Sequence, residues 1–263
     1  MTVLSSAVGS VLAALGAFLA GIYWRQERLI FHPQPLPASY AFDLPDTVER
    51  SVAVDGAVLS ALHLRLPDPK GIVFYLHGNA GNLVDWFADT SLYRHANFDL
   101  FMLDYRGYGK STGRIRSEAQ LRADAATAWQ QIAAQYEGRR KVIVGRSLGS
   151  ALAAQLAAET NPDLTVLISP YWSMTELARL HFPLAPRGLL RYRLETFRDV
   201  ARIDGPLLLV HGGRDTLIPF THSVRLQAVA RAAQFVGISR AAHDDPEEFA
   251  EYRRAFSECL AKL

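Results

Sequence analysis

The sequence predicts an α/β fold in which a mostly parallel sheet carries helices on both faces. Short apolar runs rich in β-branched residues recur along the chain, and segments of helical character separate them. The chain has 263 residues, of which 49% are hydrophobic, so it can form one large domain with a substantial core. No internal repeat is present that would indicate a solenoid.

The predicted elements follow one another from residue 50 to the end of the chain. Two strands, Arg50–Val54 and Val58–Leu66, flank the hairpin signal Asp55-Gly56. Helical character extends over Leu83–His95 and Glu118–Tyr136. Further strands are predicted at Gly71–Leu76, Phe98–Leu103, Lys141–Val144, Leu164–Ile168, Pro206–Val210 and Gln234–Ile238.

The segment Gly145-Arg-Ser147-Leu-Gly149 lies at the junction between a predicted strand and an alanine-rich helix. In this context, Gly-x-Ser-x-Gly is typical of a nucleophilic serine on a sharp strand-to-helix turn. Such a turn needs neighbours without bulk, which the two glycines provide, and the helix dipole favours negative charge near Ser147. The alternative is a glycine-flanked helix start without catalytic function. We take Ser147 as the candidate nucleophile.

A serine hydroxyl needs a base to take its proton, and a third group must orient that base. Where the serine occupies such a turn, the acid and then the histidine follow it along the chain. His243 lies on the loop after the last predicted strand, and Asp215 follows the strand before it. These are the predicted base and acid. Asp244 and Asp245 adjoin the histidine and are alternative acids, and Asp215 could instead only anchor a turn.

The other histidines after the serine are assigned structural positions. His211 ends a predicted strand, and His181 and His222 fall in helix-like segments, where surface or cap positions are expected.

An oxyanion hole needs two backbone N–H groups. We predict the amide of Leu148 as the first and that of Asn79, in preference to Ala80, as the second.

Residues 170–205 form too long an interval for an ordinary crossover between strands. Its proline-broken helices predict a small cap insertion over the carboxyl ends of the strands, where open α/β sheets place their sites. The expected catalytic domain therefore covers residues 50–263 and includes this cap.

The first part of the chain predicts a membrane anchor. Val3–Trp24 contains no charged residue and is long enough, as a helix, to cross the hydrocarbon core of a bilayer. No basic residue precedes the span and bulky residues end it, so an uncleaved anchor over residues 1–25 is favoured over a signal peptide. Arg25 and Arg28 follow the span, which favours a cytoplasmic catalytic domain. Prolines indicate an extended connector over residues 26–49.

Taken together, these motifs resemble the α/β-hydrolase superfamily in order and spacing. Within it, the sequence is similar to a membrane-anchored branch that includes eukaryotic protein depalmitoylases and lysophospholipid lipases. The similarity covers residues 25–263, and one departure is Ala241-Ala242, where relatives often carry glycine. The motifs that carry the resemblance are Arg28-Leu-Ile-Phe-His-Pro33, His77-Gly-Asn-Ala-Gly-Asn82, Asp104-Tyr-Arg-Gly-Tyr-Gly-Lys-Ser111, Gly145-Arg-Ser-Leu-Gly149, His211-Gly-Gly-Arg-Asp-Thr-Leu-Ile-Pro219 and His243-Asp244.

The resemblance implies a serine hydrolase that cleaves an ester or thioester, with an acyl or lipid-like substrate, through an acyl-enzyme. Two alternatives stay open: a serine peptidase of the same fold and a catalytically silent binding module.

A net charge of +2 argues against nucleic acid as a partner. Cys259 is the single cysteine, so no disulfide framework or cysteine metal site is expected. No metal or organic cofactor is implied, and the oligomeric state is left open.

Overall fold

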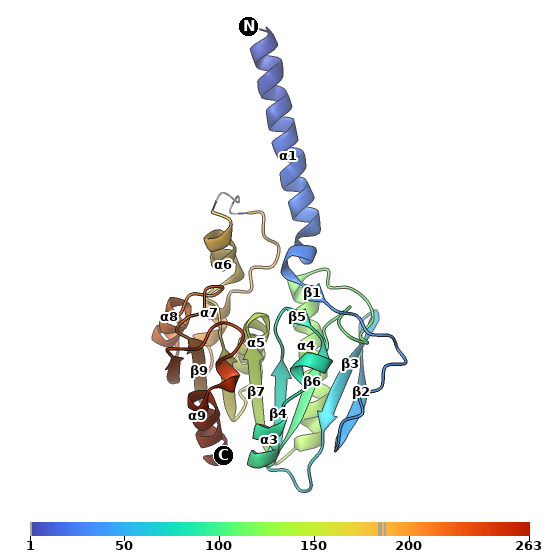
Figure 1. Ribbon diagram of the computed structural model, residues 1–263, viewed down its shortest axis with the longest axis vertical. Coiled ribbons are helices and arrows are strands. Elements are labelled where there is room, and N and C mark those ends of the chain that lie inside the picture. The colour runs from blue at the N-terminus through green and yellow to red at the C-terminus, as the bar shows by residue number, and fades with distance from the viewer. Residues whose placement is uncertain (1, 184–185, 187) are drawn as a thin grey trace.

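The computed structural model describes residues 2–183, 186 and 188–263, and for residues 2–13 and 15 it describes the backbone alone. The described chain forms an eight-stranded sheet with helices packed on it, and one long N-terminal helix that rises away from the sheet (Figure 1). A short two-stranded parallel pair, β1 and β5, lies beside the base of that helix.

The strands of the main sheet follow the order β10-β9-β8-β7-β4-β6-β3-β2. Only the hairpin strands β2 and β3 introduce antiparallel pairing, and all other neighbours are parallel. The strands are β1 (His32–Pro33), β2 (Thr47–Val54), β3 (Ala57–Leu64), β4 (Gly71–Leu76), β5 (Ala80–Gly81), β6 (Phe98–Leu103), β7 (Arg140–Arg146), β8 (Leu164–Ile168), β9 (Leu207–Gly212) and β10 (Ala233–Ile238).

The helices are α1 (Thr2–Ile30), α2 (Leu83–Trp86), α3 (Ser91–Ala96), α4 (Glu118–Ala133), α5 (Leu148–Thr160), α6 (Met174–His181), α7 (Thr196–Val200), α8 (Thr221–Val229) and α9 (Ala250–Ala261), with short 3₁₀ turns η1 (Ala134–Tyr136) and η2 (Pro246–Glu248). The predicted α/β fold with a mostly parallel sheet is therefore confirmed.

Two hydrophobic cores lie on opposite faces of the sheet. Along β4, Phe74 packs with Trp129 of α4 on one face, while Tyr75 belongs to the core that contains Phe256 of α9. Successive side chains of a strand point to opposite faces, so a strand covered on both sides is apolar throughout. All six residues of β4 are buried, which places this strand and its neighbour β7 at the centre of the molecule.

The single helix predicted over residues 83–95 is instead two short helices. In α2 the side chain of Asn82 accepts a hydrogen bond from the backbone N–H of Val84 at 2.8 Å. Asp89 Oδ1 in turn accepts from the N–H of Ser91 at 2.9 Å, where α3 begins. Short polar side chains that bond to nearby backbone groups compete with a continuous helix, and this splits the segment.

The interval predicted to form a cap joins β8 to β9 and contains α6 and α7. It begins against the main domain: Trp172 stacks on Phe197 with ring centroids 4.7 Å apart, and the backbone N–H of Trp172 donates to His222 Nδ1 at 2.9 Å. Residues 184, 185 and 187 of this interval lie outside the described residues. In Figure 1, α6 and the loop after it stand beside the base of α1.

The N-terminal helix α1 is continuous from Thr2 to Ile30, so it extends five residues beyond the predicted anchor, 1–25, into the predicted connector. Across the part of the chain that the structure describes, no helix combines the length and the apolar character needed to cross a membrane. Residues 3–13 and 15 of the predicted span have no described side chains. The predicted transmembrane helix is therefore not supported.

Candidate active site

Ser147 occupies the turn between β7 and α5, with φ +50° and ψ −116°. A positive φ is costly for a residue with a side chain, and such strain persists where the surrounding structure fixes it. Gly145 and Gly149 make the turn possible because an added Cβ would lie 2.4 Å from the carbonyl oxygen of Gly149 and 2.0 Å from that of Leu76, respectively. The backbone N–H of Ser147 donates to the carbonyl of Ile168 at 2.9 Å, which ties the turn to β8.

The structure brings the three residues named from the sequence together. His243 Nε2 lies 3.0 Å from Ser147 Oγ, and His243 Nδ1 lies 2.7 Å from Asp215 Oδ2. A carboxylate can only accept, so His243 Nδ1 must carry the hydrogen in this contact. The neutral ring then presents the lone pair of Nε2 to the serine hydroxyl. This is the tautomer that can take a proton from Ser147.

Asp215 is buried and held by several donors. Its Oδ1 accepts from the backbone N–H groups of Leu217 at 2.9 Å and Ile218 at 2.7 Å. Burial alone raises the pKa of the Asp215 carboxyl, but hydrogen bonds from His211 and His243 outweigh it and hold the pKa well below its usual range. Asp215 is therefore ionised at neutral pH and can orient and stabilise a positively charged His243.

His211 has a more specific position than the sequence indicates. Its Nε2 lies 2.8 Å from the carbonyl oxygen of Ile218 and 3.2 Å from Asp215 Oδ2, so this nitrogen carries the hydrogen. Its Nδ1 lies 2.7 Å from Ser223 Oγ. His211 is buried, and it contacts Oδ2 of Asp215, whereas the backbone donors bind Oδ1.

The other predicted positions differ in part from the structure. His222, expected at the surface or in the cap, is buried, because α8 packs on the sheet and turns the imidazole toward the cap backbone. His181 is exposed and contacts the carbonyl of Leu217 at 2.9 Å. Among the alternative acids, Asp245 accepts from the backbone N–H of Ala242 at 2.7 Å and so shapes the loop.

Arg146, the variable position between Gly145 and Ser147 in the motif, holds the loop that carries His243. Its guanidinium donates to the carbonyl oxygen of His243 at 2.8 Å and pairs with Glu247 at 2.8 Å. It also stacks over the ring of Trp86, 5.2 Å from the centroid. No sequence signal identifies this role, since it depends on η2 folding back beside β7.

The two residues predicted to supply oxyanion-hole amides come from different parts of the chain, Leu148 from α5 and Asn79 from the turn between β4 and β5. Leu148 is the first residue of α5, where a backbone N–H has no acceptor within the helix. Asn79 is fixed by three hydrogen bonds: its carbonyl accepts from His32 N–H at 2.8 Å and from the Tyr108 hydroxyl at 2.6 Å, and its side chain donates to Ile30 at 3.0 Å. Both residues line the same cavity as Ser147.

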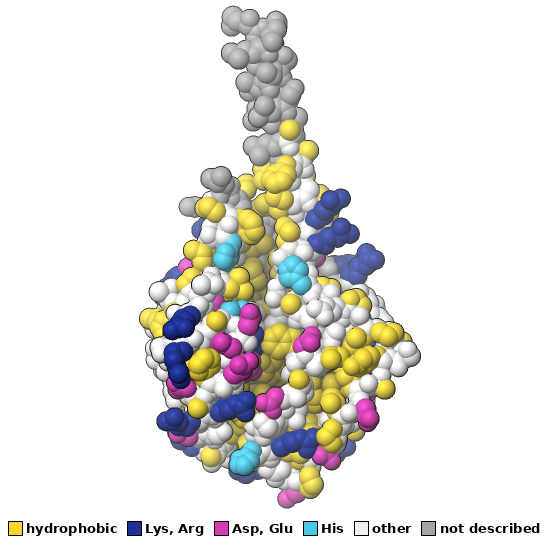
Figure 2. All heavy atoms as spheres, viewed as in Figure 1, with side chains coloured by type: hydrophobic (Ala, Val, Ile, Leu, Met, Phe, Trp, Pro, Cys, Tyr) yellow, Lys and Arg dark blue, Asp and Glu magenta, His cyan; other side chains and the backbone are white. Residues whose placement is uncertain are grey.

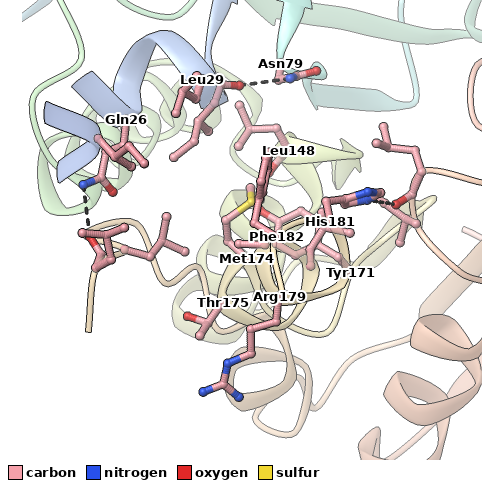
Figure 3. Close-up of a pocket in the computed structure, with 18 of the residues that line it drawn as sticks. Gln26, Leu29, Asn79, Leu148, Tyr171, Met174, Thr175, Arg179, His181 and Phe182 are labelled. Atoms are coloured by element: carbon pink, nitrogen blue, oxygen red, sulfur yellow. Dashed lines mark hydrogen bonds between the residues drawn. The ribbon is translucent and has the colours of Figure 1, made fainter. Parts of the chain in front are cut away.

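This cavity measures about 440 Å³ and opens between α1 and α6. Hydrophobic side chains gather along the described part of α1 and in the hollow between the two helices (Figure 2). In Figure 3, Met174 and Phe182 lie around the cavity with Leu148, while the guanidinium of Arg179 extends away from it. The apolar side chains that line it are Ile22, Leu29, Ile30, Leu148, Met174, Leu177, Ala178, Phe182, Pro186, Leu189, Leu190, Leu217 and Ile218.

The arrangement combines an activatable hydroxyl, a base in the required tautomer and an apolar cavity. Nucleophilic attack on an acyl carbon needs these groups and donors for the developing oxyanion. Within the described residues, no three His, Cys, Asp or Glu side chains converge as metal ligands would. The hydrogen-bonded residues and the apolar cavity together suit nucleophilic acyl transfer.

Known proteins resemble this chain in sequence and in structure. The family model described as "serine aminopeptidase, S33" matches residues 67–191. An uncharacterised protein of Mycobacterium tuberculosis is 34% identical over 240 residues, which cover 86% of this chain and 83% of that protein. Human alpha/beta hydrolase domain-containing protein 17B is 30% identical over 193 residues, which cover 71% of this chain and 65% of that protein.

An esterase of Pyrococcus furiosus is similar in structure, with a TM-score of 0.71, at 17% sequence identity. The match covers 89% of this chain and 97% of the esterase. At this identity the similarity shows a shared fold. The superposition therefore places this chain in a structural class without specifying a substrate.

Proposed function

Because the chain belongs to the α/β-hydrolase superfamily, we propose that it is a serine hydrolase that cleaves carboxylic esters or thioesters of apolar acyl groups. The observation that carries this proposal is the hydrogen-bonded series Asp215–His243–Ser147, which ends in an apolar cavity. The esterase with a similar fold agrees with it.

The proposed reaction has two steps. Ser147 Oγ attacks the acyl carbon while His243 Nε2 takes its proton, and the tetrahedral oxyanion is stabilised by the N–H groups of Leu148 and Asn79. His243 then gives the proton to the departing alcohol or thiol, which leaves an acyl-Ser147 ester. In the second step water attacks the acyl carbon while His243 takes a proton from it, and His243 then returns that proton to Ser147 Oγ as the carboxylic acid leaves. Asp215 keeps His243 in the reactive tautomer throughout.

The lining of the cavity supports an apolar acyl group. Ligand sites of this kind are mostly apolar, with a few polar groups that fix orientation, and their volumes are about 300–1,000 Å³. The cavity beside Ser147 fits this description, since aliphatic side chains of α1, α6 and the loop after α6 form most of its wall. An acyl chain placed there would exchange contact with water for contact with these apolar side chains, which is favourable.

The matching family model is described as an aminopeptidase, so a peptidase is the competing proposal. An aminopeptidase must hold the positively charged amine of its substrate, for which a buried carboxylate is the usual partner. Among the described residues that line the cavity there is no aspartate or glutamate, and Arg179 is the charged side chain beside it. This composition favours a neutral acyl group over a substrate amine.

A side-by-side comparison of substrates tests the proposal. We expect p-nitrophenyl octanoate and octanoyl thioesters to be hydrolysed with kcat/KM at least ~100-fold above that of leucine p-nitroanilide, because the apolar contacts have no counterpart for the amine. The Ser147→Ala variant is the blank for every substrate. Preferential cleavage of the aminoacyl amide would reject the acyl-ester proposal in favour of the peptidase.

A further inference from the structure

The last turns of α1 form one wall of the cavity that contains Ser147. Four residues of this helix, Ile22, Gln26, Leu29 and Ile30, line it. The sequence predicts that residues 1–25 are an anchor separate from the catalytic domain, yet Ile22 contributes to the same cavity as the nucleophile. Figure 3 shows Gln26 and Leu29 on the side of the cavity opposite His181 and Phe182 of the cap.

A buried polar side chain fastens this wall to the cap. Gln26 is only 3% exposed. Its Oε1 accepts from the backbone N–H of Arg191 at 2.7 Å, and its Nε2 donates to the carbonyl oxygens of Tyr23 at 2.8 Å and Leu189 at 3.3 Å. A glutamine buried within an apolar wall is costly unless its hydrogen bonds are made. These contacts therefore fix the spacing between α1 and residues 188–195, which precede α7 and are called the cap loop below.

Neighbouring contacts strengthen the same junction. Glu27 forms an ion pair with Arg191 and accepts from the hydroxyl of Tyr192 at 2.9 Å. Phe31 is buried and packs edge-on against the ring of Tyr192, with centroids 5.2 Å apart. The end of α1 is thus built into the cap by polar and aromatic contacts.

The residues of α1 that line the cavity follow one another away from the reacting atoms, from Ile30 back to Ile22. Ile30 is at the near end, since its carbonyl oxygen accepts from the side chain of Asn79 at 3.0 Å. Ile22 lies eight residues earlier, roughly 12 Å along the axis at about 1.5 Å per residue. A chain that extends from Ser147 along this wall would meet Ile30 first and Ile22 last.

We propose that the wall formed by residues 22–30 of α1 determines the length of the acyl chain that the enzyme accepts, and that Gln26 sets the width of the pocket by holding the cap loop. This inference rests on the proposed function and adds a specificity determinant to it. Ile22 forms the distal part of the pocket, which only a long acyl group reaches. Gln26 is a positioning residue.

The test compares p-nitrophenyl acetate with p-nitrophenyl octanoate in the full-length chain. In Ile22→Trp the indole fills the distal pocket, and we expect the octanoate-to-acetate ratio of kcat/KM to fall by at least ~10-fold, because each methylene kept in water lowers transition-state binding. Ile22→Ala removes contacts without adding bulk and should lower the same ratio by roughly threefold. The matched control is Arg25→Trp, on an exposed part of α1, which should leave the ratio unchanged.

Gln26→Ala tests the positioning role through the Michaelis parameters. We expect KM for octanoate to rise several-fold, with a smaller change in kcat, since the cap loop loses its fixed spacing while Ser147 and His243 keep theirs. Equal losses of kcat for both esters would assign Gln26 a general structural role and contradict the proposal.

The outcomes distinguish failure of the inference about α1 from failure of the proposed function. If the wild-type chain hydrolyses octanoate and both Ile22 variants, folded by circular dichroism, keep the wild-type ratio, then α1 does not determine acyl length. Equal effects of Ile22→Trp and Arg25→Trp would also overturn the inference. If the wild-type chain cleaves neither ester, the proposed function itself fails.

Discussion

Ser147→Ala is expected to lower kcat for p-nitrophenyl octanoate by about 10⁶-fold, because removal of the nucleophile from a triad leaves only binding and oxyanion stabilisation. The fold should be unaffected, since the turn at Ser147 is held by Gly145, Gly149 and a backbone hydrogen bond to Ile168. The measurement is single-turnover and steady-state kinetics at saturating substrate, with thermal melting as the check on folding.

A double variant adds a second criterion. Groups that act as one unit give non-additive losses. Ser147→Ala combined with His243→Ala should therefore be scarcely less active than Ser147→Ala alone. Additive losses would mean that His243 acts independently of Ser147, which the 3.0 Å contact between them argues against.

Asp215→Asn is expected to lower kcat by about 10⁴-fold. Asparagine has the size of aspartate, but its amide group can donate to Nδ1 of His243 and so stabilise the tautomer that carries the proton on Nε2. In that tautomer the ring cannot accept the proton of Ser147. Loss of the carboxylate also removes the negative charge that stabilises protonated His243. Asp215→Asn therefore lowers kcat in two ways, through the wrong tautomer and through a less stable imidazolium.

The matched control for this variant is Asp245→Asn. Asp245 uses one side-chain oxygen to accept from the N–H of Ala242, and asparagine retains such an oxygen. The control should keep activity within about tenfold of wild type, as surface substitutions outside the reacting groups have small effects. If Asp215→Asn were active and Asp245→Asn or Asp244→Asn inactive, the acid would have to be reassigned.

The sheet could be predicted because its strands are short and continuously apolar. Gly71–Leu76, Phe98–Leu103 and Leu164–Ile168 have in the structure the bounds expected from the sequence. Fully buried parallel strands need apolar side chains on both faces, and this leaves a strong signal. The proximity of Ser147, Asp215 and His243 could also be predicted from the sequence, because each residue follows a strand at the carboxyl edge of the sheet. Their catalytic roles stay predictions.

Features that depend on contacts between distant segments could not be predicted. Arg146 holds the loop that carries His243 by pairing with Glu247, and His211 of β9 contacts Asp215. Neither contact leaves a pattern in the sequence. The uncharged residues before Trp24 led to the prediction of a membrane anchor, which the structure does not support. Composition did not reveal that Ile22 lines the cavity or that Gln26 binds the cap.

The most direct test of the proposed mechanism is the reaction with an alkyl fluorophosphonate, followed by intact-mass measurement and peptide mapping. Attack of Ser147 Oγ on phosphorus, with loss of fluoride and transfer of the proton to His243, should give one adduct on the peptide that contains Ser147. Prior heat denaturation should abolish the adduct. A native protein that forms no adduct, or an adduct that persists in Ser147→Ala, would contradict the assignment of Ser147 as the nucleophile.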